Sequence, residues 1–260
     1  MLSSCSPRNA ANAGMDPAPS ETVSQPSLVD SLEWTLRVAE IPPDLAAEIA
    51  EAIHEGPAFI LDLLACLEGD PYLRVFVDKS HALPASYVPP DLAELRGGSY
   101  SVSRAGLQLR QAAADSLAEM ASAAGRDGIS LVASSTYRSF EYQGEVYDRI
   151  VRTLGQEAAD RESAQPGHSQ HQLGLAVDFG SIDDTFAETA ASHWLIENSG
   201  RYGWSLSYPQ GYEALTGYRW ESWHYRYVGR DLSAFIDAYF QGIQHYALRF
   251  IYEWEKAGGF

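Results

Sequence analysis

Two short stretches of the chain hold residues that could bind a metal ion and activate water. His171 precedes Asp178 by seven residues in the first stretch, and Glu221 precedes His224 by three in the second. Imidazole and carboxylate groups are zinc ligands, and a catalytic zinc usually has three protein ligands and one open position. His171, Asp178 and His224 would leave that position for a water molecule, from which the unligated Glu221 could take a proton.

Local structure decides whether His171 and Asp178 can converge. A strand that begins at Leu173 would place Asp178 on the face opposite the large apolar side chains, next to glycine and alanine. His171 has the opposite parity, so it meets Asp178 only if it lies in a turn before the strand and folds back. Without that turn, the pair would be a surface histidine and a solvated aspartate.

The second stretch needs a similar irregularity. On a regular strand, Glu221 and His224 would lie on opposite faces, so we expect a turn or bulge near Ser222. The alternative is an aromatic-rich core strand whose histidine is only packed. His168 competes with His171 for a ligand position, but we expect it to line the cleft or face solvent.

The elements that must position these residues follow from hydrophobic periodicity and from glycine and proline stops. The pattern predicts helices over 28–39, 43–54, 58–68, 103–124, 140–154 and 231–256, and strands over 73–77 and 129–133. Cys66 falls on the apolar face of its helix, which indicates a packed thiol. Arg138 lies between the strand at 129–133 and the following helix, where it could be solvated or could bind a carboxylate.

The same residues carry a family resemblance. The pattern Ser-x-His-x-x-Gly-x-Ala-x-Asp from Ser169 to Asp178, with Glu-x-Trp-His from Glu221 to His224, resembles the VanY-type D-alanyl-D-alanine carboxypeptidases. These are zinc peptidases of peptidoglycan and belong to the LAS-type peptidases. The likeness extends over residues 77–229 and includes Tyr-Arg-Ser around Arg138.

The resemblance implies a role for each matching residue. It makes His171, Asp178 and His224 the zinc ligands, Glu221 the base that activates water, Arg138 the oxyanion stabiliser, and Ser169 and Gln143 the groups that hold the substrate's terminal carboxylate. The sequence departs from the family at two positions. Ser222 stands where a proline is usual, and Ser207 replaces a common arginine. We expect the first to affect loop rigidity and the second to affect recognition beyond the scissile bond.

The function implied is zinc-dependent removal of the C-terminal D-Ala from peptidoglycan stem peptides. Two alternatives remain within the same class: an L,D-carboxypeptidase that acts on tetrapeptide stems, or an enzyme with both activities. A non-catalytic peptidoglycan-binding module and a purely structural lipoprotein are alternatives of another class. The intact set of His171, Asp178, His224, Glu221 and Arg138 argues against both.

Composition argues against a binder of nucleic acid. The 260 residues include 35 acidic and 18 basic ones, and the resulting net charge of −17 repels phosphate backbones. With 45% hydrophobic residues, the chain can build a core. Its two cysteines exclude a disulfide-rich scaffold and a four-thiolate zinc site. We expect a monomer.

The first residues bear on location. Leu2-Ser3-Ser4-Cys5 resembles the lipobox of bacterial lipoproteins, which suggests a lipid anchor at Cys5, although no basic and apolar stretch precedes it. The alternative is a free cysteine in a flexible tail. No apolar run reaches the length of about 18 residues that indicates a membrane span. The resemblance to peptidoglycan peptidases, together with the lipobox-like start, implies an extracytoplasmic protein, periplasmic or in the cell envelope.

These observations predict an α+β fold. We expect a small, mainly antiparallel sheet with helices packed around it, a zinc cleft, and a helical N-terminal extension. The expected organisation is a flexible tether over 1–27, the helical extension over 28–72 and a zinc carboxypeptidase domain over 73–260.

Overall fold

The computed structural model describes Met1 and residues 27–259. The flexible tether expected over 1–27 and the lipid anchor expected at Cys5 therefore lie almost entirely outside the described residues. Among the residues described, no helix is both long enough and apolar enough to cross a membrane.

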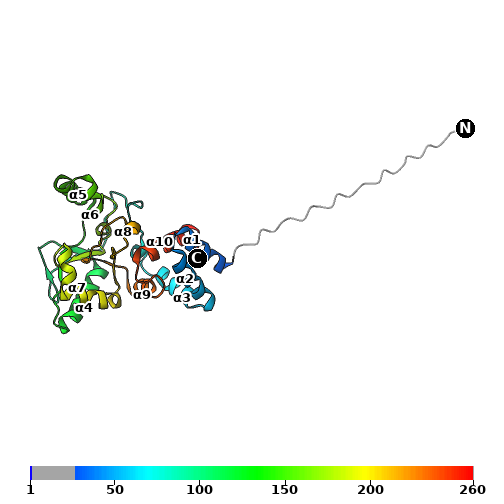
Figure 1. Ribbon diagram of the computed structural model, residues 1–260, viewed down its shortest axis with the longest axis horizontal. Coiled ribbons are helices and arrows are strands. Elements are labelled where there is room, and N and C mark those ends of the chain that lie inside the picture. The colour runs from blue at the N-terminus through cyan, green and yellow to red at the C-terminus, as the bar shows by residue number, and fades with distance from the viewer. Residues whose placement is uncertain (2–26, 260) are drawn as a thin grey trace.

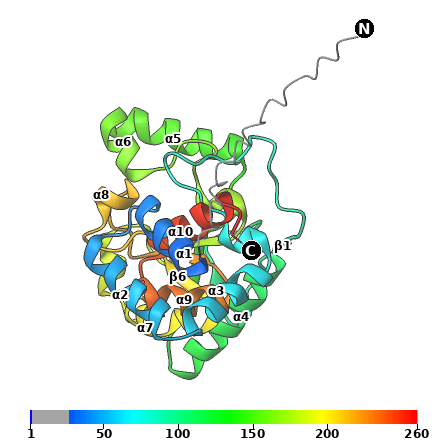
Figure 2. The same ribbon diagram turned by 90° about the vertical axis from the view of Figure 1, so that its right-hand side faces the viewer.

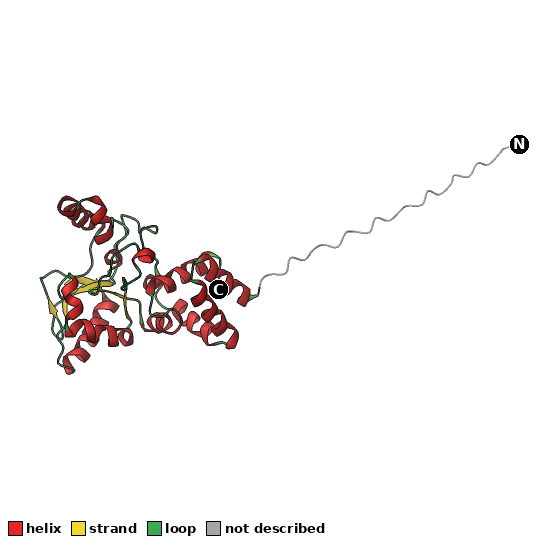
Figure 3. Cartoon of the chain, viewed as in Figure 1, coloured by secondary structure: helices red, strands yellow, loops and turns green. Residues whose placement is uncertain are grey.

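A five-stranded sheet lies at the centre of the part of the chain that carries the two motifs (Figure 3). Its strands are, in spatial order, β2 (Ser101–Val102), β4 (Val132–Ser135), β5 (Ala176–Phe179), β7 (His224–Tyr227) and β6 (Trp204–Leu206). Only the β2–β4 pair is parallel, which confirms the predicted mainly antiparallel sheet. Strands β1 (Leu92–Glu94) and β3 (Gln108–Arg110) form a separate antiparallel pair.

The register of the central strands brings the two motifs together. Asp178 on β5 lies directly opposite His224 on β7, and Ser135 on β4 is its partner on the other side. Directly opposed residues of neighbouring strands share a face of the sheet. Two motifs that are far apart in the sequence therefore present an aspartate and a histidine to the same space.

Helices surround this sheet. Helices α4 (Gln111–Arg126) and α7 (Ala190–Asn198) share a hydrophobic core with the sheet strands. Helix α5 (Phe140–Leu154) has the predicted bounds, and its N-terminus is capped by Ser139, whose Oγ accepts the Tyr142 N–H. It packs with α6 (Gln156–Glu162) on the side of the sheet opposite α4 and α7 (Figure 1). A short helix, α8 (Glu213–Thr216), precedes the second motif.

The predicted N-terminal helices form a second core with the C-terminal ones. Helices α1 (Leu28–Val38), α2 (Pro43–Glu55) and α3 (Ala58–Glu68) pack with α9 (Arg230–Tyr239) and α10 (Gln244–Lys256), as Figure 2 shows from that side. Phe59 joins the helices, because its ring lies 5.2 Å from that of Phe235 and 5.9 Å from that of Phe250. Cys66 is buried in the same core, and burial raises the pKa of its thiol to about 12.

The strand predicted over 73–77 is wrong. Residues Pro71–Arg74 form a single 3₁₀ turn, and the segment after it pairs with no strand. The physical reason is Arg226, whose buried Nη2 donates hydrogen bonds to the carbonyl oxygens of Leu73 and Val75, both at 2.9 Å. These carbonyls therefore have a side-chain partner in place of a sheet ladder.

Three other boundaries differ from the predictions. The helix predicted from 103 begins only at Gln111, because residues 108–110 pair with β1, and the strand predicted over 129–133 is shifted to Val132–Ser135. The single helix predicted over 231–256 is two helices. Gln241 and Gly242, with φ of 52° and 75°, lie between them in the left-handed region, which a continuous helix cannot contain.

Candidate metal and catalytic site

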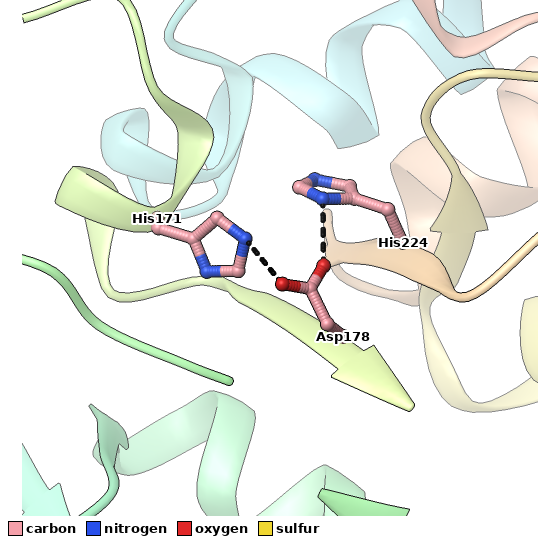
Figure 4. A group of neighbouring side chains, drawn as sticks. All are labelled: His171, Asp178 and His224. Atoms are coloured by element: carbon pink, nitrogen blue, oxygen red, sulfur yellow. Dashed lines mark ion pairs between the residues drawn. The ribbon is translucent and has the colours of Figure 1, made fainter. Parts of the chain in front are cut away.

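His171, Asp178 and His224 meet where strand β5 ends and strand β7 begins (Figure 4). Asp178 Oδ2 lies 3.2 Å from His171 Nε2, and Asp178 Oδ1 lies 3.0 Å from His224 Nδ1. All three residues are buried, and one donor atom from each lies within 4.8 Å of the others. Three convergent N, O and N donors are a set that suits zinc.

A turn before β5 delivers His171, as the opposite parity of His171 and Asp178 requires. Residues Gln170–Leu173 form a 3₁₀ turn, which Gly174 ends with a φ of 69°. A side chain on Gly174 would also approach Leu92 Cδ2 at 2.9 Å, so both conformation and space favour glycine there. The Oγ of Ser169 accepts the His171 N–H at 3.3 Å and caps the turn.

The protonation states at this cluster fit a cation. His171 Nδ1 lies 2.7 Å from the Thr136 carbonyl oxygen, and because a carbonyl only accepts, Nδ1 carries the proton and Nε2 presents a lone pair to Asp178. Burial and then the charge of Arg138 lower the pKa of His171 to about 4, so the imidazole is neutral at pH 7.

The carboxyl group of Asp178, which faces the lone pair of His171 Nε2, is ionised. Burial alone would raise the pKa of its carboxyl group, but the proximity of His171 and then of His224 holds this pKa well below its usual range. Arg138 Nη2 also donates a charge-assisted hydrogen bond to Oδ2 at 3.1 Å. His171 Nε2 and Asp178 Oδ1 are also buried without a hydrogen-bond partner. A lone pair and a carboxylate that face each other in a buried space attract a cation, and the donor set therefore fits zinc.

Glu221 lies beside this cluster without joining it. Residues Ser222 and Trp223 form the turn predicted near Ser222, and the His224 N–H bonds back to the Glu221 carbonyl oxygen at 3.3 Å. The turn brings Glu221 Oε2 to 3.5 Å from His224 Nδ1. Burial, and then the charge of Asp178, raise the pKa of Glu221 well above its usual value. A divalent cation at the cluster would act in the opposite direction, toward a carboxylate.

Arg138 approaches the cluster from the loop before α5. Its Nη2 donates to Asp178 Oδ2 at 3.1 Å, its Nη1 donates to Gln143 Oε1 at 2.8 Å, and its Nε donates to Ser135 Oγ at 3.2 Å. Gln143 itself is fully buried, and its amide donates to the Ala164 carbonyl oxygen at 2.7 Å. Gln143 holds the guanidinium group of Arg138 in place and does not line the pocket onto which the cluster opens.

These groups open onto a pocket of about 530 Å³. Six of the seven residues singled out from the sequence line it, namely Arg138, Ser169, His171, Asp178, Glu221 and His224. Three further arginines, Arg104, Arg149 and Arg219, also line the pocket. In a chain with a net charge of −17, four guanidinium groups thus line this pocket together with the carboxylates of Glu162, Asp178 and Glu221, so positive charge gathers here against the net charge of the chain.

Two other residues singled out from the sequence lie outside this pocket. His168 faces neither the metal cluster nor this pocket, and its Nδ1 bonds to the Asp78 carbonyl oxygen at 2.7 Å. Ser207, expected to influence recognition, is buried outside the pocket, where its hydroxyl donates to Gln170 Oε1 at 2.7 Å.

Two supporting residues were missed from the sequence. Thr136 orients His171 through a main-chain carbonyl, which no side-chain pattern reveals. Gln170 lies 3.2 Å from His224 Nε2 through its Oε1, although the two residues are far apart in the chain. The only available signal was the position of Gln170 next to His171 in the first motif.

Comparison with known proteins identifies relatives of this chain. Residues 106–230 match the family model described as VanY, D-alanyl-D-alanine carboxypeptidase. A D-alanyl-D-alanine carboxypeptidase of Enterococcus faecalis (strain ATCC 700802 / V583) is 31% identical over 221 residues, which cover 80% of this chain and 78% of the relative.

Solved structures show the same fold. The LdcB LD-carboxypeptidase is 34% identical with a TM-score of 0.57, and the match covers 64% of this chain and 85% of LdcB. The vancomycin resistance D,D-pentapeptidase VanY, solved as a glutamate-to-alanine mutant in complex with Zn(II), is 32% identical with a TM-score of 0.56, and the match covers 66% of this chain and 96% of that one.

Proposed function

Because this chain belongs to the VanY family of D-alanyl-D-alanine carboxypeptidases, we propose that it is a zinc enzyme that removes the C-terminal D-Ala from peptidoglycan stem peptides. The observation that carries the proposal is the lone pair of His171 Nε2 facing the ionised, buried Asp178, with His224 Nδ1 on the other side. The similar VanY structure, which contains Zn(II), supports the choice of metal.

His171, Asp178 and His224 would hold the zinc ion. When bound, zinc supplies a Lewis acid that polarises the scissile carbonyl and makes water more acidic. Glu221, which is near the cluster but outside it, takes the proton of the attacking water and then delivers it to the nitrogen of the departing D-Ala.

Arg138 has the charge and position to stabilise the transition state. The carbonyl oxygen of the scissile bond gains negative charge as water attacks, and a guanidinium group held in advance lowers the energy of that state. The hydrogen bonds from Arg138 to Gln143 and Ser135 provide this fixed position. Ser169, at the same pocket, is the group we assign to the terminal carboxylate of the substrate.

An L,D-carboxypeptidase is the second candidate. The observation that favours it is the likeness to LdcB, an LD-carboxypeptidase, at 34% identity. In either case the substrate is a peptide of the cell wall, so we propose that the enzyme works outside the cytoplasm. A non-catalytic binding module is disfavoured because Glu221 and Arg138 both line the pocket.

Product analysis separates these activities. The zinc-loaded protein is incubated with a stem pentapeptide that ends in D-Ala-D-Ala and, separately, with the tetrapeptide that ends in a single D-Ala. Mass spectrometry should show loss of one alanine from the pentapeptide, leaving the tetrapeptide. Conversion of the tetrapeptide to a tripeptide would assign L,D activity. If neither peptide is shortened at any enzyme concentration, the proposed function is wrong.

A further inference from the structure

Buried amide side chains lie behind His224, on the side of the ring that faces away from Asp178. Gln170 contacts the ring nitrogen Nε2, and Gln244, the first residue of α10, contacts Gln170. We propose that Gln170 and Gln244 are positioning residues that fix the tautomer of His224, so that Nε2 carries the proton and Nδ1 offers its lone pair to zinc. This inference rests on the proposed zinc function.

The direction of these hydrogen bonds is set by a backbone group. The carbonyl oxygen of Ser205, on β6, can only accept, and Gln244 Nε2 donates to it at 3.2 Å. Gln244 Oε1 must then point the other way, where it accepts from Gln170 Nε2 at 3.2 Å. The orientation of the Gln244 amide therefore determines the orientation of the Gln170 amide.

The same orientation reaches the imidazole ring. With its nitrogen committed to Gln244, Gln170 presents Oε1 to His224 Nε2 at 3.2 Å. An amide oxygen has no proton to give, so the ring nitrogen must be the donor. A neutral His224 with its proton on Nε2 has an unprotonated Nδ1, and this is the atom 3.0 Å from Asp178 Oδ1.

Burial prevents water from taking over this role. Gln170, Gln244 and His224 are 6%, 1% and 4% exposed. If Gln244 were reversed, its oxygen would face the Ser205 carbonyl with no proton between them. If Gln170 alone were reversed, its oxygen would face that of Gln244 in the same way. Either reversal leaves buried acceptors unpaired, so the orientation that exposes the Nδ1 lone pair is preferred.

Ser207 differs from the two glutamines. Its hydroxyl lies 2.7 Å from Gln170 Oε1 and 3.4 Å from Gln244 Oε1, and a hydroxyl can rotate to donate or to accept. It therefore follows the orientation of the amides and does not set it. Ser207→Ala is for this reason a matched control at the same buried location.

The position of Gln244 also assigns a role to the helical part of the molecule. Helix α10 packs in the core that contains α1, α2 and α3, so the orientation of a zinc ligand depends on a residue anchored in that core. The helices of this core thereby support the metal site.

The test measures zinc affinity by competition with a chromophoric chelator, using the full chain. Gln170→Met removes the acceptor at nearly constant volume, and we expect zinc to bind about 10- to 100-fold more weakly, the usual effect of losing a partner of a metal-bound histidine. Ser207→Ala should stay near the parent value. Gln244→Met should weaken zinc binding in the same direction as Gln170→Met.

A spectroscopic measurement accompanies the affinities. In the zinc-loaded parent, ¹⁵N-edited NMR of the imidazole groups should show a slowly exchanging Nε2–H for His224. Thermal unfolding of the metal-free variants identifies any that do not fold, and Gln244→Met then provides the test in place of Gln170→Met.

The outcomes distinguish this inference from the proposed function. Parent-like zinc affinity in both methionine variants, or zinc bound through His224 Nε2, overturns the positioning role while the proposed function stands. Absence of zinc binding by the parent overturns the proposed function itself.

Discussion

Glu221→Ala is expected to bind zinc as the parent does and to release D-Ala from a pentapeptide about 10²- to 10⁴-fold more slowly. Zinc is retained because the three donor atoms that converge come from His171, Asp178 and His224. Activity is expected to fall because we propose Glu221 as the base, and its Oε2 lies 3.5 Å from His224 Nδ1. Zinc content tests the expected metal binding, and initial rates of D-Ala release test the expected loss of activity.

Glu213→Ala is the matched control for the loss of a carboxylate. Glu213 on α8 pairs with Arg161 at 2.7 Å at the surface and does not line the pocket. We expect this variant to keep the parent rate. An undiminished rate in Glu221→Ala would show that Glu221 is not the catalytic base. Loss of zinc from that variant would instead indicate that Glu221 is a zinc ligand.

Arg138→Gln is expected to lower kcat about 10²- to 10³-fold, the usual effect of removing a group that stabilises an oxyanion, with a smaller change in KM. The guanidinium group lies 3.1 Å from Asp178 and is held by Gln143 and Ser135. Steady-state kinetics on the pentapeptide, with zinc content measured in parallel, test this expectation.

Arg149→Gln is the control for charge in the same pocket. Arg149 lines the pocket on α5, and it has no contact with the metal cluster. Its loss should mainly raise KM, since it weakens the attraction of an anionic peptide without touching the reacting carbonyl. If Arg138→Gln changed only KM, Arg138 would be a binding group and not a stabiliser of the transition state.

The convergence of the candidate site could be predicted because it depends on local geometry. The opposite parity of His171 and Asp178 required a turn, and the spacing of Glu221 and His224 required another near Ser222. The structure has both turns, at Gln170–Leu173 and at Ser222–Trp223. Fold class, family and the three N-terminal helices follow in the same way from motifs and periodicity.

The remaining features depend on contacts between distant segments. Nothing in the sequence near residues 73–77 indicates that the buried Arg226 donates hydrogen bonds to carbonyl oxygens of this segment, which therefore does not form a strand. The orientation of Gln170 likewise depends on Gln244, which is more than 70 residues away in the chain. Such pairings become visible only when the tertiary structure brings the segments together.

The most direct test of the central claim is the zinc dependence of D-Ala release. The protein is stripped with a chelator, dialysed, and assayed on a stem pentapeptide before and after addition of zinc. We predict negligible release without metal and full recovery when one zinc ion per chain is bound, since one cluster of three candidate ligands is present among the described residues. Undiminished release by the metal-free protein would contradict this prediction.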